Sequence, residues 1–219
     1  MTSHLLTFDV HCHEFNETRE LVLVSDPSDK HLEYVKNEWT PILEAFKDRA
    51  FLAYRALPPQ DQSQSSFQDK LGLFGAPDAH WDWTYKRNNM SGLSHRMYAV
   101  LDGESVEALM RVDLSKQSRL DKTPLTPIVY VDYLAIAPWN RRPIQQPPRF
   151  NGLGTVLLGT AVSLSNNEGM DGRCGLHSLI QAEGFYKGAG MTDLGADPAA
   201  DGLKYFEFSP QAAELFLKE

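Results

Sequence analysis

The 219-residue sequence predicts a mixed α/β (α+β) fold built around one sheet. Three observations favour this class. A hairpin is expected where the apolar runs 96–101 and 105–112 meet at Asp102-Gly103, because Asp-Gly between apolar runs is a strong hairpin signal. The run 128–137 is rich in β-formers and predicts a buried central strand. Apolar residues at helical spacing over 152–168 predict an amphipathic helix that follows this strand.

The N-terminal part is expected to be mainly helical. A short strand is predicted at 20–24, and a helical run at 31–55 with a break at Pro41. Residues 57–66 are expected to form a loop, and the aromatic and polar stretch 79–89 has no clear period.

The C-terminal part continues the alternation of strands and helices. A strand is expected at 172–179, a short helix at 181–189 and a final strand at 203–208. The sequence contains no internal repeat, and its length suits one domain spanning residues 1–219.

Composition excludes several classes of protein. A formal net charge of −8 argues against nonspecific binding of nucleic-acid phosphates. Two cysteines, Cys12 and Cys174, do not imply a disulfide framework and indicate a reducing compartment. The first 20 residues lack a signal-peptide layout, and no apolar run approaches the ~20 residues that span a bilayer. The sequence therefore predicts a cytoplasmic protein with no membrane partner.

A candidate phosphate site lies where the central strand leads into the helix. It comprises Arg149, Phe150, Asn151, Gly152, Leu153, Gly154 and Thr155. A helix N-terminus exposes unpaired N–H groups and carries partial positive charge, and glycines let an anion approach the backbone. The arginine would add a charge-assisted contact. The alternative is that the two glycines only allow the helix to pack closely against the strand.

Three motifs in order resemble the GNAT family of N-acetyltransferases. They are 130–141 (YVDYLAIAPWNR), 149–155 (RFNGLGT) and 184–191 (GFYKGAGM). The resemblance covers roughly residues 96–208, and the first 95 residues match only loosely. It implies a mostly antiparallel central sheet flanked by helices, with the cofactor-binding core in 96–208.

The resemblance also implies an activity, which is direct transfer of acetyl from acetyl-CoA to a primary amine, without a metal. Backbone amides of 149–155 would bind the pyrophosphate, and the backbone of Leu134 and Ile136 would pair with the pantetheine arm. An amide near Leu134 or Ala135 would polarise the thioester carbonyl. Tyr186 would protonate the departing thiolate.

The sequence departs from the family pattern in two places. The loop from Pro138 to Arg149 is longer than in compact members, which leaves its role open. Leu179 stands seven residues before Tyr186, where the family often has an asparagine that contacts CoA.

A base is needed, because only the neutral amine attacks and an alkylammonium has a pKa near ~10.4. Asp132 is the first candidate, since it shares a strand face with Tyr130 and Leu134. Glu183, three residues before Tyr186, is the second, and a water chain is a third possibility. Each of these residues also has a purely structural alternative. Asp132 could be a strand carboxylate that is hydrogen-bonded for stability, Glu183 a solvated charge on a helix, and Tyr186 an aromatic residue of the core.

Trp81 and Trp83, with Tyr130, are candidates for an acceptor pocket, because aromatic rings near a carboxylate suit a cationic amine. The alternative for the two tryptophans is packing within a long loop. The sequence His11-Cys12-His13-Glu14 invites a metal interpretation, but no second cluster completes a ligand set, and no metal is expected. His177 is expected to be a hydrogen-bonded core histidine.

Two rival functions remain open at this point. One is a non-catalytic module that binds acyl-CoA as a sensor, and the other is a nucleotide-binding domain. Gly154 is followed by Thr155-Val156 and not by Lys-Ser/Thr, which disfavours the second. The acceptor is a small molecule, a protein amine or an aminoacyl-tRNA, and the oligomeric state, a dimer included, is left open.

Overall fold

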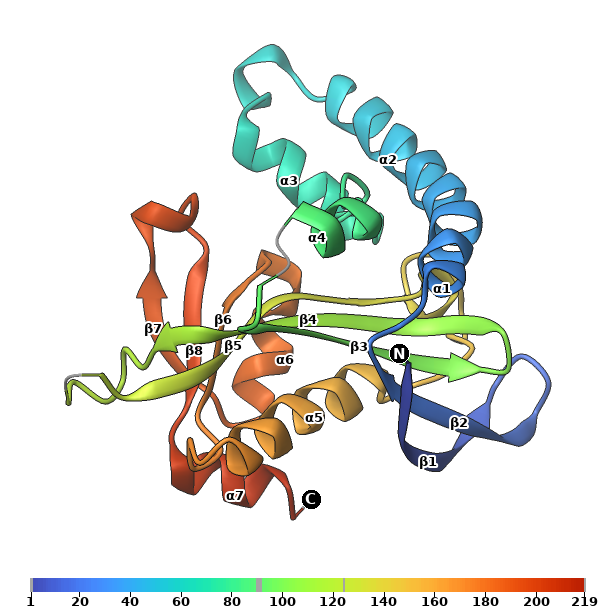
Figure 1. Ribbon diagram of the computed structural model, residues 1–219. Coiled ribbons are helices and arrows are strands. Elements are labelled where there is room, and N and C mark those ends of the chain that lie inside the picture. Colours follow the sequence, from blue (N-terminus) through green and yellow to red (C-terminus); the bar gives the residue numbers. More distant parts are fainter. Residues whose placement is uncertain (1, 90–91, 124, 219) are drawn as a thin grey trace. The chain divides into compact units, whose positions relative to one another are not determined.

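The structure is a computed structural model that describes residues 2–89, 92–123 and 125–218. In the described part of the chain, eight strands form one sheet in the order β1-β2-β3-β4-β5-β6-β8-β7 (Figure 1). The β5–β6 pair is parallel, whereas β1–β2, β2–β3, β6–β8 and β7–β8 are antiparallel. The predicted fold class, a mixed and mostly antiparallel sheet with helices, is confirmed.

The strands are β1 (Ser3–Cys12), β2 (Glu17–Ser25), β3 (His95–Asp102), β4 (Ser105–Gln117), β5 (Pro127–Ile136), β6 (Cys174–Ser178), β7 (Thr192–Ala196) and β8 (Lys204–Phe208). The α-helices are α1 (Asp29–Tyr34), α2 (Thr40–Arg55), α3 (Gln64–Leu73), α4 (Trp83–Asn89), α5 (Leu153–Asn167), α6 (Glu183–Gly188) and α7 (Pro210–Phe216). A π-helical segment covers Val35–Trp39, and 3₁₀ turns cover Pro59–Asp61, Pro138–Asn140, Ile180–Ala182 and Pro198–Ala200. No helix in these described ranges is long and apolar enough to cross a bilayer.

The chain divides into two compact units. Unit 1 comprises 1–91, 97–109 and 135–153, and unit 2 comprises 92–96, 110–134 and 154–219. Strands β3, β4 and β5 each contribute residues to both units. The single domain expected from the sequence stays a prediction.

In unit 1, β1 and β2 form a hairpin whose register runs from Ser3↔Ser25 to Cys12↔Glu17. β2 then pairs with β3 from Val22↔Leu101 to Ser25↔Tyr98. The predicted strand at 20–24 is therefore longer than expected. β1 was not predicted, although Leu6, Phe8, Val10 and Cys12 alternate with polar residues along it and mark one apolar face. Only Cys12 of its ten residues is buried.

The predicted helical run breaks as expected near Pro41. Ser28 caps α1, and its backbone N–H donates to His31 Nδ1 at 3.0 Å. The π-helical segment Val35–Trp39 follows, and α2 then begins with Pro41 in its first turn, where a proline costs no hydrogen bond. The break thus precedes the proline.

The expected loop at 57–66 ends early, because α3 begins at Gln64. Ser63 caps this helix by accepting from the Ser66 amide at 3.1 Å. α4 begins at Trp83 within the stretch that showed no period, and Asp82 Oδ1 accepts from the Tyr85 amide at 2.8 Å. A helix of seven residues is too short to show a periodic pattern.

In unit 2, β6 lies between β5 and β8, and the parallel β5–β6 ladder is short. It pairs Val129–Val131 with Cys174–Leu176 and ends there. β5 nevertheless runs on to Ile136 and β6 to Ser178, and the last two residues of β6 pair with β8 alone. The sheet therefore opens between β5 and β6 beyond Val131.

Gly175 on β6 gives a stability prediction. A Cβ there would overlap the Tyr205 hydroxyl and come within 3.0 Å of Ile128 Cδ1. Gly175→Ala is expected to lower the free energy of unfolding by about 1–3 kcal/mol, the usual cost of overpacking, measured by urea titration. Gly184→Ala on α6 is the control, because its Cβ meets no atom within 4 Å. Equal midpoints for both variants would show that the β6–β8 contact relaxes without cost.

Candidate functional site

The loop between β5 and α5 is held by one buried carboxylate. Glu107 on β4 is fully buried and accepts from Trp139 Nε1 at 2.6 Å and Asn140 Nδ2 at 2.7 Å. Arg149 Nη1 donates to the same carboxylate at 3.2 Å. The first and last residues of the loop are therefore joined through Glu107.

Further hydrogen bonds fix this loop. Asn140 Oδ1 accepts from the Phe150 amide at 2.9 Å, and Trp139 O accepts from the Arg149 amide at 3.0 Å. Arg141 donates to Ile136 O at 2.9 and 2.7 Å and forms a two-pronged ion pair with Asp78 at 2.5 and 2.8 Å. A loop that looks unconstrained in the sequence is thus held rigidly.

The predicted phosphate site has an exposed backbone at its centre. Gly152 has φ +81°, and a Cβ there would meet no atom within 4 Å. α5 begins at the next residue, so its first N–H groups have no intrahelical partner. Among the described residues, the amides of Asn151, Gly152 and Leu153 donate to no loop carbonyl or side chain. The start of α5 is therefore open to an anion.

The other predicted residues of this segment divide by role. Phe150 and Leu153 are buried anchors, whereas Asn151 and Thr155 are exposed. A Cβ on Gly154 would lie 3.5 Å from Phe185 Cζ, so this glycine serves close packing against α6. The anion-binding interpretation of the glycines therefore suits Gly152, and the close-packing interpretation suits Gly154.

The Arg149 side chain has carboxylate partners in the structure. Its Nε donates to Glu14 at 2.5 Å, Nη1 contacts Glu107, and the guanidinium lies 4.9 Å from the Trp139 ring centroid. The side chain works as a clamp between the β1–β2 turn and the loop. The predicted phosphate contact of this guanidinium would need one of these partners to release it.

The segment Leu134, Ala135 and Ile136 follows the end of the β5–β6 ladder. Ala135 is buried, and its two neighbours are half-buried. Backbone N–H and C=O groups of a strand need partners. Beyond Val131, β6 does not supply them on its side of β5, so an extended ligand could pair there as an added strand.

Tyr186 on α6 is buried, with 7% of its surface exposed, and burial raises the pKa of its phenol. Its ring packs on Phe185 at 5.1 Å and Phe206 at 6.0 Å. The Tyr186 hydroxyl makes no hydrogen bond to any described residue. Its oxygen is not completely enclosed by protein atoms. It therefore stays protonated and keeps some access to solvent.

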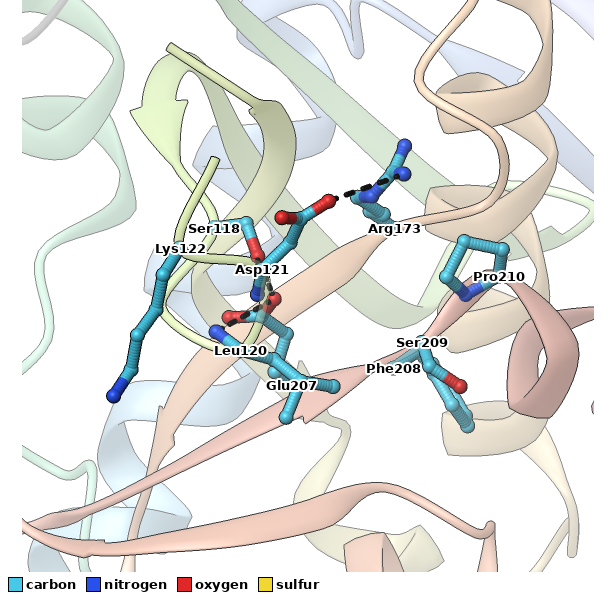
Figure 2. A pocket seen from close by; sticks show the side chains of 9 residues that line it. All are labelled: Ser118, Leu120, Asp121, Lys122, Arg173, Glu207, Phe208, Ser209 and Pro210. Carbon is cyan, nitrogen blue, oxygen red and sulfur yellow. Dashed lines mark hydrogen bonds and ion pairs between the residues drawn. The ribbon is translucent and has the colours of Figure 1, made fainter. Parts of the chain in front are cut away.

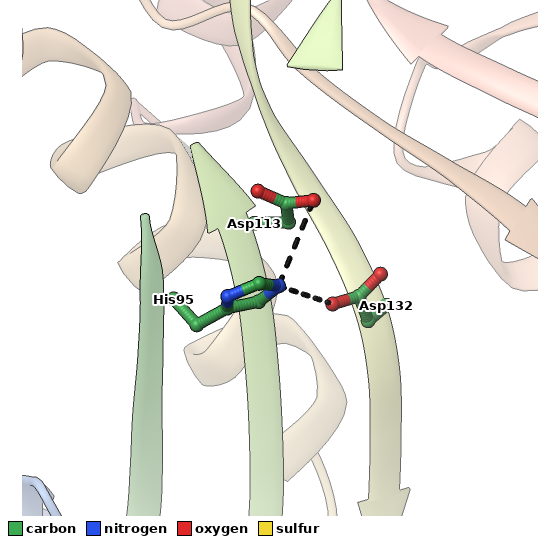
Figure 3. A group of neighbouring side chains, drawn as sticks. All are labelled: His95, Asp113 and Asp132. Carbon is green, nitrogen blue, oxygen red and sulfur yellow. Dashed lines mark ion pairs between the residues drawn. The ribbon is translucent and has the colours of Figure 1, made fainter. Parts of the chain in front are cut away.

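Asp132 lies in a cluster on three neighbouring strands. Arg111, which is 1% exposed, donates to Asp132 Oδ2 at 2.7 Å. His95 Nε2 lies 3.9 Å from the same oxygen and 3.7 Å from Asp113 Oδ2 (Figure 3). Burial raises the pKa of Asp132, and Arg111 opposes that shift. Burial also works against ionisation of Asp113, but hydrogen bonds from Ser115 hold its pKa below the ordinary value.

One nitrogen and two carboxylate oxygens of this cluster lie within 4.8 Å of one another. That donor set could hold a divalent cation. The buried guanidinium of Arg111 already neutralises Asp132, however, and a second cation beside it would be repelled. The geometry fits an ion-pair network better than a metal centre.

Glu183 lies at the start of α6, where the sequence placed it, and accepts from Lys204 Nζ at 2.6 Å. This contact raises the pKa of Lys204. Lys187 on the same helix pairs with Asp193 at 3.2 Å. Both carboxylates considered as bases, Asp132 and Glu183, thus have cationic partners.

Tyr130 lies in unit 2 and donates or accepts a hydrogen bond at His177 Nδ1, at 2.6 Å. His177 Nε2 contacts Asp197 Oδ2 at 2.9 Å. Both ring nitrogens are occupied and only 11% of the side chain is exposed, so the prediction of a hydrogen-bonded core histidine is confirmed.

Trp81 and Trp83 lie in unit 1, with ring centroids 5.9 Å apart. With His80, Asp82, Lys36 and Glu44 they line a pocket of about 220 Å³. Trp83 is buried, and Lys86 Nζ lies 4.9 Å from the Trp81 ring centroid. The rings do line a hollow with a carboxylate, and a cation already contacts one of them.

A second hollow of about 390 Å³ in unit 2 contains none of the predicted site residues (Figure 2). The buried carboxylate of Glu207 accepts there from the Ser118 hydroxyl and from the Arg119 amide at 2.8 Å. Arg173 Nη2 lies 3.6 Å from Asp121. These contacts tie the end of β4 to β6 and β8, which is a structural role.

Sequence reasoning missed Glu107, Arg111, His95 and Asp113. Glu107 and Arg111 did carry a signal, because a charge inside an apolar strand run must be paired if it is buried. The partners themselves lie far away in the sequence, so no local pattern names them.

No protein-family model and no curated protein matches the sequence. Solved structures do resemble it. The PaiA N-acetyltransferase from Thermoplasma acidophilum in complex with coenzyme A is 11% identical, with a TM-score of 0.46 over 84% of this chain and 97% of that one. An acetyltransferase assigned to the GNAT family from Desulfovibrio desulfuricans is 13% identical, with a TM-score of 0.46 over 85% and 96%. Both of these neighbours are described as acetyltransferases, and the second as one of the GNAT family.

A third neighbour is a mutant AtaT toxin bound to the C-terminus of the antitoxin AtaR and acetyl-CoA. It is 20% identical, with a TM-score of 0.42 over 62% of this chain and 78% of that one.

Proposed function

We propose that this protein is a GNAT-family enzyme that transfers the acetyl group of acetyl-CoA to a primary amine. The observation that carries the proposal is the short β5–β6 ladder, which ends at Val131↔Leu176 and leaves the rest of β5 without a β6 partner. The chain then leads through a rigid loop to the open amides at Gly152. An extended arm that ends in a diphosphate suits these two features in that order along the chain.

The residues divide the chemistry among them as follows. Backbone groups of Leu134 and the N–H of Ile136 pair with the pantetheine arm, since Arg141 already donates twice to Ile136 O. An amide near Leu134 or Ala135 polarises the thioester carbonyl. The neutral amine attacks this carbonyl, the C–S bond breaks, and Tyr186 gives its proton to the thiolate. Asp132 is the first candidate to take the amine's proton, directly or through water, and Glu183 is the second.

The acceptor is proposed to be cationic before it reacts. The aromatic pocket at Trp81 and Trp83, with Asp82 and Glu44, suits an ammonium group, and the net charge of −8 attracts one. Tyr130 is proposed as an acceptor contact on the face of β5 that carries Asp132. No metal is assigned to this chemistry.

One observation favours a second function, an acyl-CoA-binding module without catalysis. Both candidate carboxylate bases are already ion-paired, Asp132 with Arg111 and Glu183 with Lys204. A carboxylate oxygen that already accepts a hydrogen bond from a cation has fewer lone pairs left for a reacting amine. Calorimetry with acetyl-CoA, followed by CoA-release assays on a panel of spermidine, an aminoglycoside, a lysine peptide and a free N-terminal peptide, separates the two functions. Binding without turnover supports the module.

Tyr186→Phe tests the acid role. The variant is expected to lose about 10²-fold in kcat, the lower range for removal of a general acid, with little change in the KM for acetyl-CoA. Tyr54→Phe is the matched control, because that tyrosine packs on Phe67 at 5.4 Å, far from α6 in the sequence. A Tyr186→Phe enzyme with wild-type kcat would assign the proton to another donor.

A further inference from the structure

Unit 2 contains a continuous hydrogen-bonded chain that the chemistry above does not use. It runs from the Tyr130 hydroxyl on β5 to His177 on β6, at 2.6 Å, and on to Asp197 after β7, at 2.9 Å. Arg119 Nη1 closes the chain on Asp197 at 2.6 Å. Each link has the length of a good hydrogen bond.

The direction of these bonds follows from Asp197. The hydrogen bond from Arg119, with those from the Ala199 amide and His177, lowers the pKa of Asp197 to about 2. The carboxylate is therefore ionised at neutral pH and can only accept. His177 must carry its hydrogen on Nε2, which leaves the Nδ1 lone pair of a neutral imidazole facing the Tyr130 hydroxyl.

This arrangement leaves the Tyr130 oxygen with lone pairs for another donor. Its own hydrogen points to His177 Nδ1, so the oxygen can accept from an ammonium group. Burial and the Asp132 charge raise the pKa of Tyr130 to about 12, so the phenol stays neutral. A neutral hydroxyl between a donor and an imidazole can pass a proton without holding a charge itself.

We propose that Tyr130 and His177 relay the proton that the acceptor amine loses, which deepens and rests on the proposed function. The ammonium N–H bond breaks and its proton goes to the Tyr130 oxygen, while the Tyr130 O–H bond breaks and that proton goes to His177 Nδ1. The products are the neutral amine, an unchanged tyrosine and an imidazolium held by the Asp197 carboxylate. His177 acts through Tyr130 and is a positioning and accepting group.

The surroundings suit this charge movement. Asp197 lies on one side of His177, and the Tyr205 ring lies 5.0 Å away on β8. Arg119 lies 4.2 Å from the Tyr205 ring centroid, and its amide contacts Glu207. Asp197, Arg119 and Tyr205 also line a pocket of about 290 Å³, through which the proton can return to solvent. Imidazole is the side chain whose charge normally changes between pH 5 and 8.

The relay also answers the objection raised by the paired carboxylates. Asp132 shares the strand face of Tyr130 but is neutralised by Arg111. With the proton sent to His177, Asp132 does not have to accept a proton, and its ion pair with Arg111 stays intact.

The test combines NMR with kinetics on the full chain. In ¹⁵N-histidine-labelled protein at neutral pH, His177 is expected to show the Nε2–H tautomer, and Asp197→Asn to lose that preference. With the best amine of the panel, Tyr130→Phe is expected to lower kcat about 10²-fold. It should leave the Kd for acetyl-CoA unchanged and lower the melting temperature only slightly, because one hydrogen bond to His177 is lost while the ring stacked 6.4 Å from Tyr205 remains. His177→Gln is expected to lower kcat with the same amine by a similar factor and to leave the Kd for acetyl-CoA unchanged.

Each outcome decides between the proposals. An Nδ1–H tautomer, or a Tyr130→Phe enzyme with wild-type kcat, overturns the relay and leaves acetyl transfer standing. If Asp132→Asn loses all activity and Tyr130→Phe keeps it, the amine's proton goes to Asp132. No turnover on any amine overturns the relay together with the proposed enzyme, and calorimetry with acetyl-CoA then tells whether binding survives.

Discussion

Replacing Gly152 by aspartate is expected to weaken acetyl-CoA binding about 10- to 100-fold, or about 1.4–2.8 kcal/mol. The new carboxylate would stand at the open start of α5, where the diphosphate is proposed to meet the unpaired amides. Gly152 has φ +81°, so any side chain there strains the backbone, and the aspartate and asparagine variants share that strain. The part of the loss that comes from charge repulsion is the difference between these two variants.

Gly152→Asn is the matched control, since it has the same shape and the same tolerance of positive φ but no charge. Calorimetry with acetyl-CoA should show a larger loss for aspartate than for asparagine. The gap should shrink at high salt, because screening weakens an exposed repulsion. Equal affinities for the two variants would place the diphosphate somewhere else.

Removing the Glu107 carboxylate is expected to cost about 3–5 kcal/mol of unfolding free energy, the usual penalty for breaking a buried charged pair. Glu107→Ala would leave the indole N–H of Trp139, the amide of Asn140 and the buried side of Arg149 without their acceptor. Each buried donor that loses its acceptor destabilises the folded state by its own desolvation free energy. Urea titration of the full chain gives the loss.

Two control variants help to interpret the loss of stability in Glu107→Ala. Glu107→Gln keeps one acceptor oxygen and should lose less than the alanine variant. Glu104→Ala, at the exposed turn three residues earlier, should stay within about 0.5 kcal/mol of the wild type. If Glu107→Ala unfolds like Glu104→Ala, the loop between β5 and α5 is held by its backbone bonds alone.

Elements with a strong local pattern could be predicted from the sequence. β5 is a continuous apolar run, α5 repeats its apolar face over four turns, and the β3–β4 hairpin has a Gly103 with φ +59° at its turn. Most of the elements that were missed are short, whereas β1 has an alternating apolar face that the sequence interpretation overlooked. β7 has five mostly exposed residues, α7 has seven, and β1 is defined by its pairing with β2.

The candidate site shows the same division. The segment 149–155 is contiguous, so its residue types alone point to an anion, and the structure leaves Gly152 open as that reading needs. Contacts between distant residues could not be predicted in this way. Arg111 meets Asp132 across 21 positions, and Arg149 meets Glu14 across 135. Charges in the sequence show that partners must exist, and only the fold selects them.

The gap that opens between β5 and β6 beyond Val131 affects how readily the protein aggregates. An internal strand with one unmatched side shares the weakness of an exposed sheet edge, which attracts other extended chains and promotes aggregation. A metabolite that fills the gap removes that weakness and, at 100 times its Kd, adds about 2.7 kcal/mol of stability. Resistance to aggregation would then depend on the concentration of the acyl donor. A low concentration leaves the open side of β5 exposed, and a high concentration covers it.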